Sequence, residues 1–182
     1  KGRNDEMENL LHQNFSLYSH IGKDYKLINI SQNREFIWLG RGYPYRWLVF
    51  MKLNNKIKMN PEQVWLELIK LYDINIPDIQ ISGKFRSFSL EIDSNNRPIR
   101  CLRGLYEHLP SDTGGPFVTY IIEDDVKNEV ILASGFVNFP ENNRRINNAE
   151  YIYPSVNYIG HYFRHNWKKL NKLNLAPNIF SA

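Results

Sequence analysis

The chain has 182 residues, of which 42% are hydrophobic and 23% are charged, and it carries a net charge of +4. This length fits one domain with a sizeable core, and the near-average composition excludes a disordered or fibrous protein. No apolar run approaches the roughly 18 residues that a membrane span needs. The chain starts with lysine and lacks the apolar core of a signal peptide, so we expect a fragment whose targeting segment lies upstream.

The first elements predicted along the chain are a helix and three strands. Residues 5–19 have the pattern of the end of a helix. Residues 24–31 and 34–42 predict a hairpin, because apolar and aromatic side chains cluster on either side of the polar turn "SQNR". Residues 45–53 predict a third strand, which places one apolar set on a single face: Trp47, Val49, Met51 and Leu53.

The clearest predicted helix spans residues 61–72. Asn60 suits the N-cap, Pro61 suits the first helical position, and Gln63 sits where a capping-box side chain reaches back. Apolar residues follow at helical spacing, so one face of this helix must cover a sheet.

Four more strands are predicted at residues 85–92, 98–108, 116–124 and 129–139. In the first of them, strict alternation predicts that Phe88, Leu90 and Ile92 face inward. The last two are apolar on both faces, so we expect them at the centre of the sheet. A helical pattern after Pro140 should break at Tyr153-Pro154. The sequence therefore predicts an α+β fold: a largely antiparallel sheet of six or seven strands, packed with helices.

Two glycines and a proline, Gly114-Gly115-Pro116, precede one of the predicted strands. A phosphate loop is excluded because Pro116 lacks an N–H, a strand follows in place of a helix, and Asp112 has the wrong charge. We expect a tight turn in which Gly114 or Gly115 has a positive φ and Pro116 starts the strand. Alternatively, Gly104, Gly115 and Gly135 line a small pocket across neighbouring strands. Sheet curvature is the simpler explanation of these glycines.

Histidines give two weaker hypotheses. His161 and His165 are spaced as two metal ligands on one helix face, but a third ligand is not evident and an exposed polar face explains them equally. His108 lies near Glu107 and Asp112 and has the chemistry of a general base, whereas a loop-end histidine needs no such role. The lone cysteine, Cys101, fits a small strand residue. No cofactor is predicted.

The C-terminal segment holds most of the positive charge. Residues 144–172 contain six basic residues against one acid, interleaved with aromatic residues. This pattern favours docking to a protein partner or an anionic membrane surface, while packing of the aromatics on the sheet is the alternative. The docking residues that we predict are Tyr162, Arg164, Trp167, Lys168, Lys169 and Lys172.

Several short strings occur in an order that is typical of one family. They are "DYKLINISQNREFIWLGRG", "RGLY", "GGPFVTY", "ASGFVNFP" and "RRINNAEYIY". Residues 20–153 thereby resemble the C-terminal half of a bacterial lipoprotein family catalogued as domain of unknown function 4837. Tyr106 stands where that family usually has tryptophan, and residues 154–182 extend beyond its usual end. The order of elements is also similar to a PsbP/Mog1-type sandwich.

The resemblance implies a protein that is lipid-anchored in the cell envelope of Bacteroidota-type bacteria, with its folded part in the periplasm or at the outer membrane. Nucleic acid is not an expected partner there. We expect residues 1–20 to be a remnant helix or linker, 21–153 the domain, and 154–182 a helical extension. The expected function is that of a non-enzymatic interaction or scaffold subunit of an envelope complex. The alternatives are a small-molecule or lipid carrier and a metal-dependent hydrolase.

Overall fold

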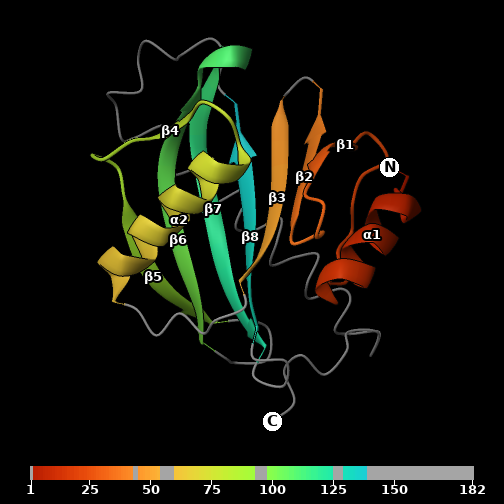
Figure 1. The fold of residues 1–182 in the computed structure, drawn as a ribbon, viewed down its shortest axis with the longest axis horizontal. Coiled ribbons are helices and arrows are strands. Elements are labelled where there is room, and N and C mark those ends of the chain that lie inside the picture. The colour runs from red at the N-terminus through yellow and green to blue at the C-terminus, as the bar shows by residue number, and fades with distance from the viewer. Residues whose placement is uncertain (1, 43–44, 54–59, 93–97, 125–128, 139–182) are drawn as a thin grey trace.

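The computed structural model describes residues 2–42, 45–53, 60–92, 98–124 and 129–138, which form helices on both sides of one antiparallel sheet (Figure 1). The predicted α+β class is confirmed. The elements are α1 (Asp5–Phe15), β1 (Lys26–Ile30), β2 (Phe36–Arg41), β3 (Arg46–Leu53), α2 (Pro61–Asn75), β4 (Ile79–Ile81), β5 (Ser87–Ile92), β6 (Pro98–His108), the 3-10 helix η1 (Leu109–Ser111), β7 (Thr113–Asp124) and β8 (Glu129–Val137).

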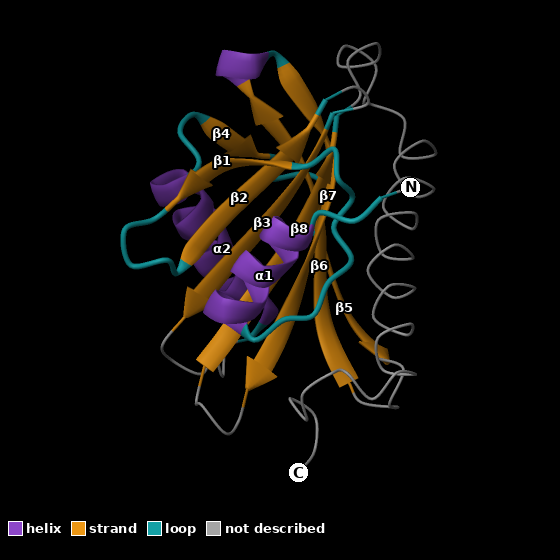
Figure 2. Cartoon of the chain, turned by 90° about the vertical axis from the view of Figure 1, so that its right-hand side faces the viewer, coloured by secondary structure: helices purple, strands orange, loops and turns teal. Residues whose placement is uncertain are grey.

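The sheet has eight strands, in the order β1-β2-β3-β8-β7-β6-β4, with β5 also paired to β6. The eighth strand, β4, was not predicted, because its three residues are too short to show alternation. β4 and β5 share one edge of β6: β4 pairs with residues 106–108 and β5 with residues 98–103. β7 and β8 lie at the centre, as their apolar sequences predict. The sheet is curled, with α1 and α2 on opposite faces (Figure 2).

Helix α2 covers one face of the sheet, called here the α2 face. Its capping box forms as predicted: Asn60 Oδ1 accepts from the Gln63 N–H at 2.9 Å, and Gln63 Oε1 accepts from the Asn60 N–H at 3.1 Å. The helix continues to Asn75, past the predicted end at residue 72. Its buried residues pack on apolar side chains of β2, β3, β6, β7 and β8: Val64, Trp65, Leu68 and Tyr72.

The predicted inward alternation of β5 is wrong at Leu90, which is 66% exposed. Leu90 pairs with Arg100 on the outer edge of β6. The described elements leave this edge of the sheet open, so an apolar residue there remains in contact with solvent. Phe88, two pairs along the ladder from Leu90, is partly buried against the α2 cluster.

A buried triangle of hydroxyl groups fixes α2 to the centre of the sheet. Tyr72 Oη lies 2.7 Å from both Thr119 Oγ1 on β7 and Ser134 Oγ on β8, and these two oxygens are 3.0 Å apart. Burial raises the pKa of the Tyr72 phenol well above its usual range. The triangle satisfies three polar groups that would otherwise be costly in an apolar core.

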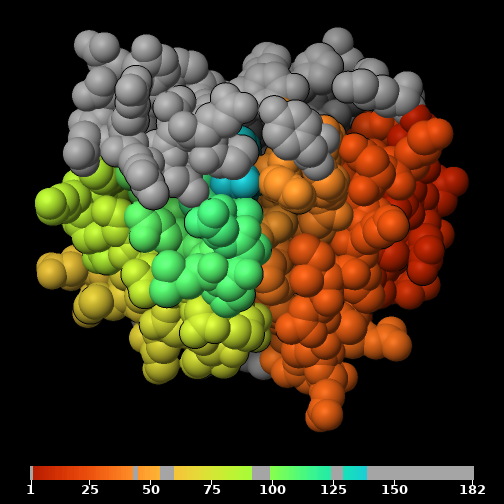
Figure 3. All heavy atoms as spheres, turned by 90° about the horizontal axis from the view of Figure 1, so that it is seen from above, coloured from red at the N-terminus to blue at the C-terminus, as the bar shows by residue number. Residues whose placement is uncertain are grey.

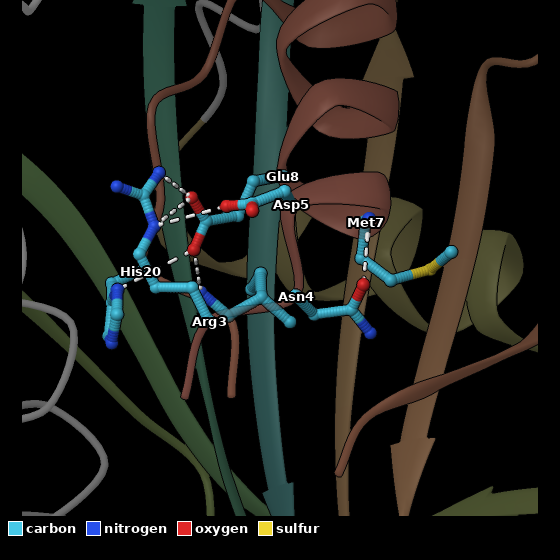
Figure 4. Close-up of polar contacts among 7 residues, drawn as sticks. Arg3, Asn4, Asp5, Met7, Glu8 and His20 are labelled. Atoms are coloured by element: carbon cyan, nitrogen blue, oxygen red, sulfur yellow. Dashed lines mark hydrogen bonds and ion pairs between the residues drawn. The ribbon is translucent and has the colours of Figure 1, made fainter. Parts of the chain in front are cut away.

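Helix α1 packs on the opposite face and is tied to the segment that follows it. Its side chains Met7, Leu11 and Phe15 share a core cluster with β2, β3 and β8. Glu8 is only 8% exposed and accepts hydrogen bonds from the Ile21 backbone N–H at 2.8 Å and from Arg3 (Figure 4). Residues 1–20 are expected as a remnant helix or linker, and the described part of this segment, from residue 2 on, contributes to a core that it shares with the sheet.

We predict that Tyr72→Phe lowers the free energy of unfolding by about 1–2 kcal/mol, because two buried hydrogen bonds disappear while Thr119 and Ser134 keep each other as partners. Denaturant unfolding measures the change. Tyr45→Phe, at a side chain that is 46% exposed, is the control and should stay within about 0.5 kcal/mol of the wild type. Equal effects of the two variants would contradict the role of the triangle.

Candidate functional site

Aromatic rings from distant strands meet at the end of the α2 face next to η1. Trp47 on β3 contacts Tyr106 and His108 on β6, with ring centroids 5.4 and 5.1 Å apart. Trp38 on β2 lies 4.9 Å from Trp47 and 6.0 Å from His108. These four residues are called here the tryptophan–histidine cluster. In the view from above, the region around η1 (green) borders the β2–β3 region (orange) (Figure 3).

Gly115 explains how Trp47 reaches across two strands. Between β3 and β6 lie β8 and β7, and on the α2 face Trp47 pairs with Phe136, which pairs with Phe117. Two residues before Phe117, Gly115 faces the same way and pairs with Tyr106. Because Gly115 contributes no side chain, the α2 face has room for the Trp47 ring at this level. Its φ of 154° also favours glycine, so the predicted positive φ is confirmed.

The predicted turn at Gly114-Gly115-Pro116 is wrong, because all three residues lie inside β7. The chain reverses earlier, through η1 and Asp112, whose φ is 46°. Pro116 is tolerated in this central strand because pairing with β8 starts only at the next residue. The Gly114 N–H is satisfied by Asn138 Oδ1 at 3.0 Å.

The glycines of the predicted pocket lie on different faces. Gly104 and Gly115 are on the α2 face, whereas Gly135 is on the opposite face, between Leu48 and Val118. A side chain at Gly104 would start 2.8 Å from the Phe117 ring and 3.1 Å from the Trp65 ring, so these rings occupy its space. The strand register therefore does not bring the three glycines together in one pocket. Ligand binding beside Gly114, Gly115 and Pro116 stays a prediction.

A chain of hydroxyl groups leads from the interior to His108. His108 Nδ1 lies 2.5 Å from Ser111 Oγ, and Ser111 Oγ lies 2.7 Å from Thr113 Oγ1. The Thr113 side chain is in turn hydrogen-bonded to the Tyr106 phenol. The Pro77 carbonyl accepts from the imidazole, because proline has no N–H to donate. In a neutral His108 with its proton on Nε2, Nδ1 accepts from the Ser111 hydroxyl. The hydroxyl groups of Ser111 and Thr113 can each donate or accept within the chain.

This arrangement favours neutral His108. Burial lowers the pKa of His108 below its usual range, and the Pro77 carbonyl and the Asp78 carboxylate oppose that shift only in part. Burial also raises the pKa of the Tyr106 phenol, which stays protonated. A proton on Nδ1 would turn the acceptor of the chain into a second donor.

A second feature of the cluster is the space above Gly40 on β2, called here the Gly40 socket. The Ile28 Cδ1 methyl group lies where a side chain at Gly40 would start, and Trp47 Cδ1 would be 3.4 Å from that side chain. Ile28 itself is 49% exposed on the edge strand β1. The indole N–H of Trp38, a residue that is 7% exposed, has no hydrogen-bond partner in the described part of the chain.

Other predicted site residues have different positions. Glu107 and Asp112 are exposed, and Asp78 is the carboxylate whose charge acts on His108. Cys101 is a buried residue of β6, as predicted. Among the described residues no three His, Cys, Asp or Glu side chains are placed to hold a metal ion. The remaining predicted site residues lie outside the described part: His161, Tyr162, Arg164, His165, Trp167, Lys168, Lys169 and Lys172.

Sequence reasoning missed Trp38, Gly40, Trp47, Ser111 and Thr113. The string "WLGRG" carried a signal, since an isolated glycine two residues after a tryptophan in a strand marks close approach by a neighbouring side chain. Ser111 and Thr113 had no such signal, because their contact with His108 depends on where the turn falls.

The fold and this cluster define an α+β domain built on one curled antiparallel sheet, with an aromatic and polar site at one end. The model of one family, "Domain of unknown function (DUF4837)", matches residues 4–150. The chain belongs to this family, as its motifs predicted, and the match includes α1. No curated protein matches the chain, and no solved structure does. No described helix is long and apolar enough to cross a membrane.

We predict that the wild type loses stability relative to His108→Asn as the pH falls from 8 to 5. The folded-state pKa of His108 is lower than the usual value of about 6.5, so the unfolded chain binds the proton more readily. The contribution of His108 is thus present above that value and lost below it. Asparagine keeps an acceptor for Ser111 but does not titrate. Parallel denaturant curves for both proteins at pH 8, 6.5 and 5 measure this, and a constant difference would contradict it.

Proposed function

We propose that this chain is the recognition domain of a lipid-anchored cell-envelope protein, and that it holds an apolar side chain of a protein partner in the Gly40 socket. The envelope location rests on the lipoprotein character that the family motifs imply. The observation that carries the binding role is the Gly40 socket itself, which is formed by glycine and tryptophan and filled by the Cδ1 methyl group of Ile28, a residue that is 49% exposed.

The socket has the features of a hot spot, a contact that contributes much of the free energy of binding between two proteins. It lies where the edge of the sheet meets solvent, and Leu27, 40% exposed, adds apolar surface next to Ile28. Tryptophan walls around a small apolar space are typical of such contacts between proteins. The methyl group that fills the socket is at the end of a flexible side chain, so an incoming side chain can replace it without moving the backbone.

The indole of Trp38 adds a polar element to this recognition. A buried donor without a partner costs about 1–3 kcal/mol. A carbonyl of the bound segment that accepts from the Trp38 N–H would recover this cost, and only in the complex. Binding is therefore supported by both an apolar exchange and a new hydrogen bond.

Gly40→Ala tests the proposal, because the added methyl group fills the socket and displaces the end of Ile28. The backbone tolerates the change, and alanine in a strand is no less stable than glycine. Gly83→Ala is the matched control, since a side chain at Gly83 meets nothing within 4 Å. The full-length proteins are purified from envelopes in mild detergent, and co-eluting proteins are quantified by mass spectrometry.

We expect one protein to be recovered in fixed proportion with the wild type and with Gly83→Ala. Its recovery with Gly40→Ala should fall at least about tenfold, which corresponds to about 1.4 kcal/mol. Equal recovery with both variants would place the partner elsewhere. A wild-type protein that elutes without any partner would reject the recognition role and favour the small-molecule carrier.

A further inference from the structure

We infer that Ser111 is a nucleophile that His108 activates, and that it reacts with small carboxylic esters that carry an apolar acyl group. This inference rests on the β6–η1–β7 connection. It shares Trp47 and Trp38 with the Gly40 socket, but it requires no bound partner.

Ser111 and His108 have the relative positions of a nucleophile and its base. A serine nucleophile needs a base within hydrogen-bond distance and a third group that orients the base. Ser111 Oγ and His108 Nδ1 are 2.5 Å apart, and the imidazole also has a hydrogen bond to the Pro77 backbone. The ring is held between Trp47 and Trp38, so its orientation is fixed by packing as well.

Ser111 is accessible to a substrate from solvent. Ser111 is exposed at the end of η1, whereas His108 is 8% exposed and the Thr113 side chain is buried. The reactive oxygen therefore lies at the surface, and the groups that activate it lie beneath. Leu109 in the same turn is 64% exposed and offers an apolar contact to an acyl group. This combination fits an ester with a short apolar acyl chain.

The reaction balances with water as the only co-reactant. Ser111 Oγ forms a bond to the carbonyl carbon of the ester while its proton moves to His108 Nδ1. The bond to the alcohol oxygen then breaks, and His108 returns the proton to the departing alcohol, leaving an acyl-serine. Water attacks this ester with His108 as base, which releases the carboxylic acid and restores Ser111.

Neighbouring groups supply the electrostatics of these steps. The Thr113 hydroxyl lies 2.7 Å from Ser111 Oγ, which places a side-chain donor beside the oxygen that attacks the ester. The imidazolium that forms in each step is stabilised by the Pro77 carbonyl and by the charge of Asp78. Both groups are already in place in the free protein.

Labelling with a fluorophosphonate probe tests the inference, because such probes react with activated serines. The modified residue is identified by peptide mass spectrometry, and the hydrolysis of p-nitrophenyl butyrate is followed in parallel. His108→Asn keeps an acceptor for Ser111 but removes the base. Ser87→Ala, at an exposed serine of β5, is the matched control.

We expect labelling at Ser111 in the wild type and in Ser87→Ala. The rate of labelling and of ester hydrolysis should fall at least about 100-fold in His108→Asn and disappear in Ser111→Ala. Denaturant unfolding of each variant shows that it is folded. Labelling of Ser111 no faster than of Ser87, or undiminished in a folded His108→Asn, would overturn the inference. Failure of partner binding alone leaves these rates unchanged, so the two proposals fail separately.

Discussion

Aromatic rings crowd the α2 face of the sheet, and their packing depends on glycines that make room. At Gly104 the Phe117 and Trp65 rings occupy the space of a side chain. At Gly115 the missing side chain lets Trp47 reach Tyr106 and His108. At Gly40 the space is taken by Ile28. Gly104 and Gly115 thereby let α2, β3 and β6 share one core, whereas Gly40 shapes the edge of that core next to β1.

This constraint connects the fold to the candidate site. Because Trp47 reaches β6, His108 is fixed between two indoles at the end of the strand, and the chain then turns through η1. The turn places the Ser111 hydroxyl next to His108 Nδ1, and the register of β6 with β7 places Thr113 opposite His108. The hydroxyl chain is thus a consequence of where the strand ends. The Gly40 socket depends on the same tryptophan from its other side.

Sequence patterns predicted the helices and strands whose formation depends on interactions between residues close in sequence. The capping box at Asn60 and Gln63, the alternation of β3 and the apolar centre of the sheet all follow from neighbours in sequence, and the structure confirms them. β4 was not predicted, because three residues pair with β6 through tertiary contact alone. Gly114-Gly115-Pro116 was misread, because glycine and proline punctuate turns, whereas here they serve close packing within a strand.

The site was harder to predict for a related reason. His108 was considered as a general base near Glu107 and Asp112, with a loop-end histidine as the simpler explanation, because an extended strand directs Glu107 to the opposite face. Ser111 and Thr113 come into contact with His108 only through the length of η1 and the register of β7, and neither is encoded by a short motif. The family motifs, in contrast, were visible as strings, since each is a short run of residues that needs no tertiary contact to be recognised.

The contact between Trp47 and His108 across two intervening strands is the central claim of this account. Nuclear Overhauser effects between the indole protons of Trp47 and the imidazole protons of His108 test it most directly. With ring centroids 5.1 Å apart, the account predicts clear cross-peaks between the two rings. Their absence, in a spectrum that shows cross-peaks between Trp47 and Phe136, would mean that Trp47 does not pass over Gly115 and would contradict both the site and its explanation.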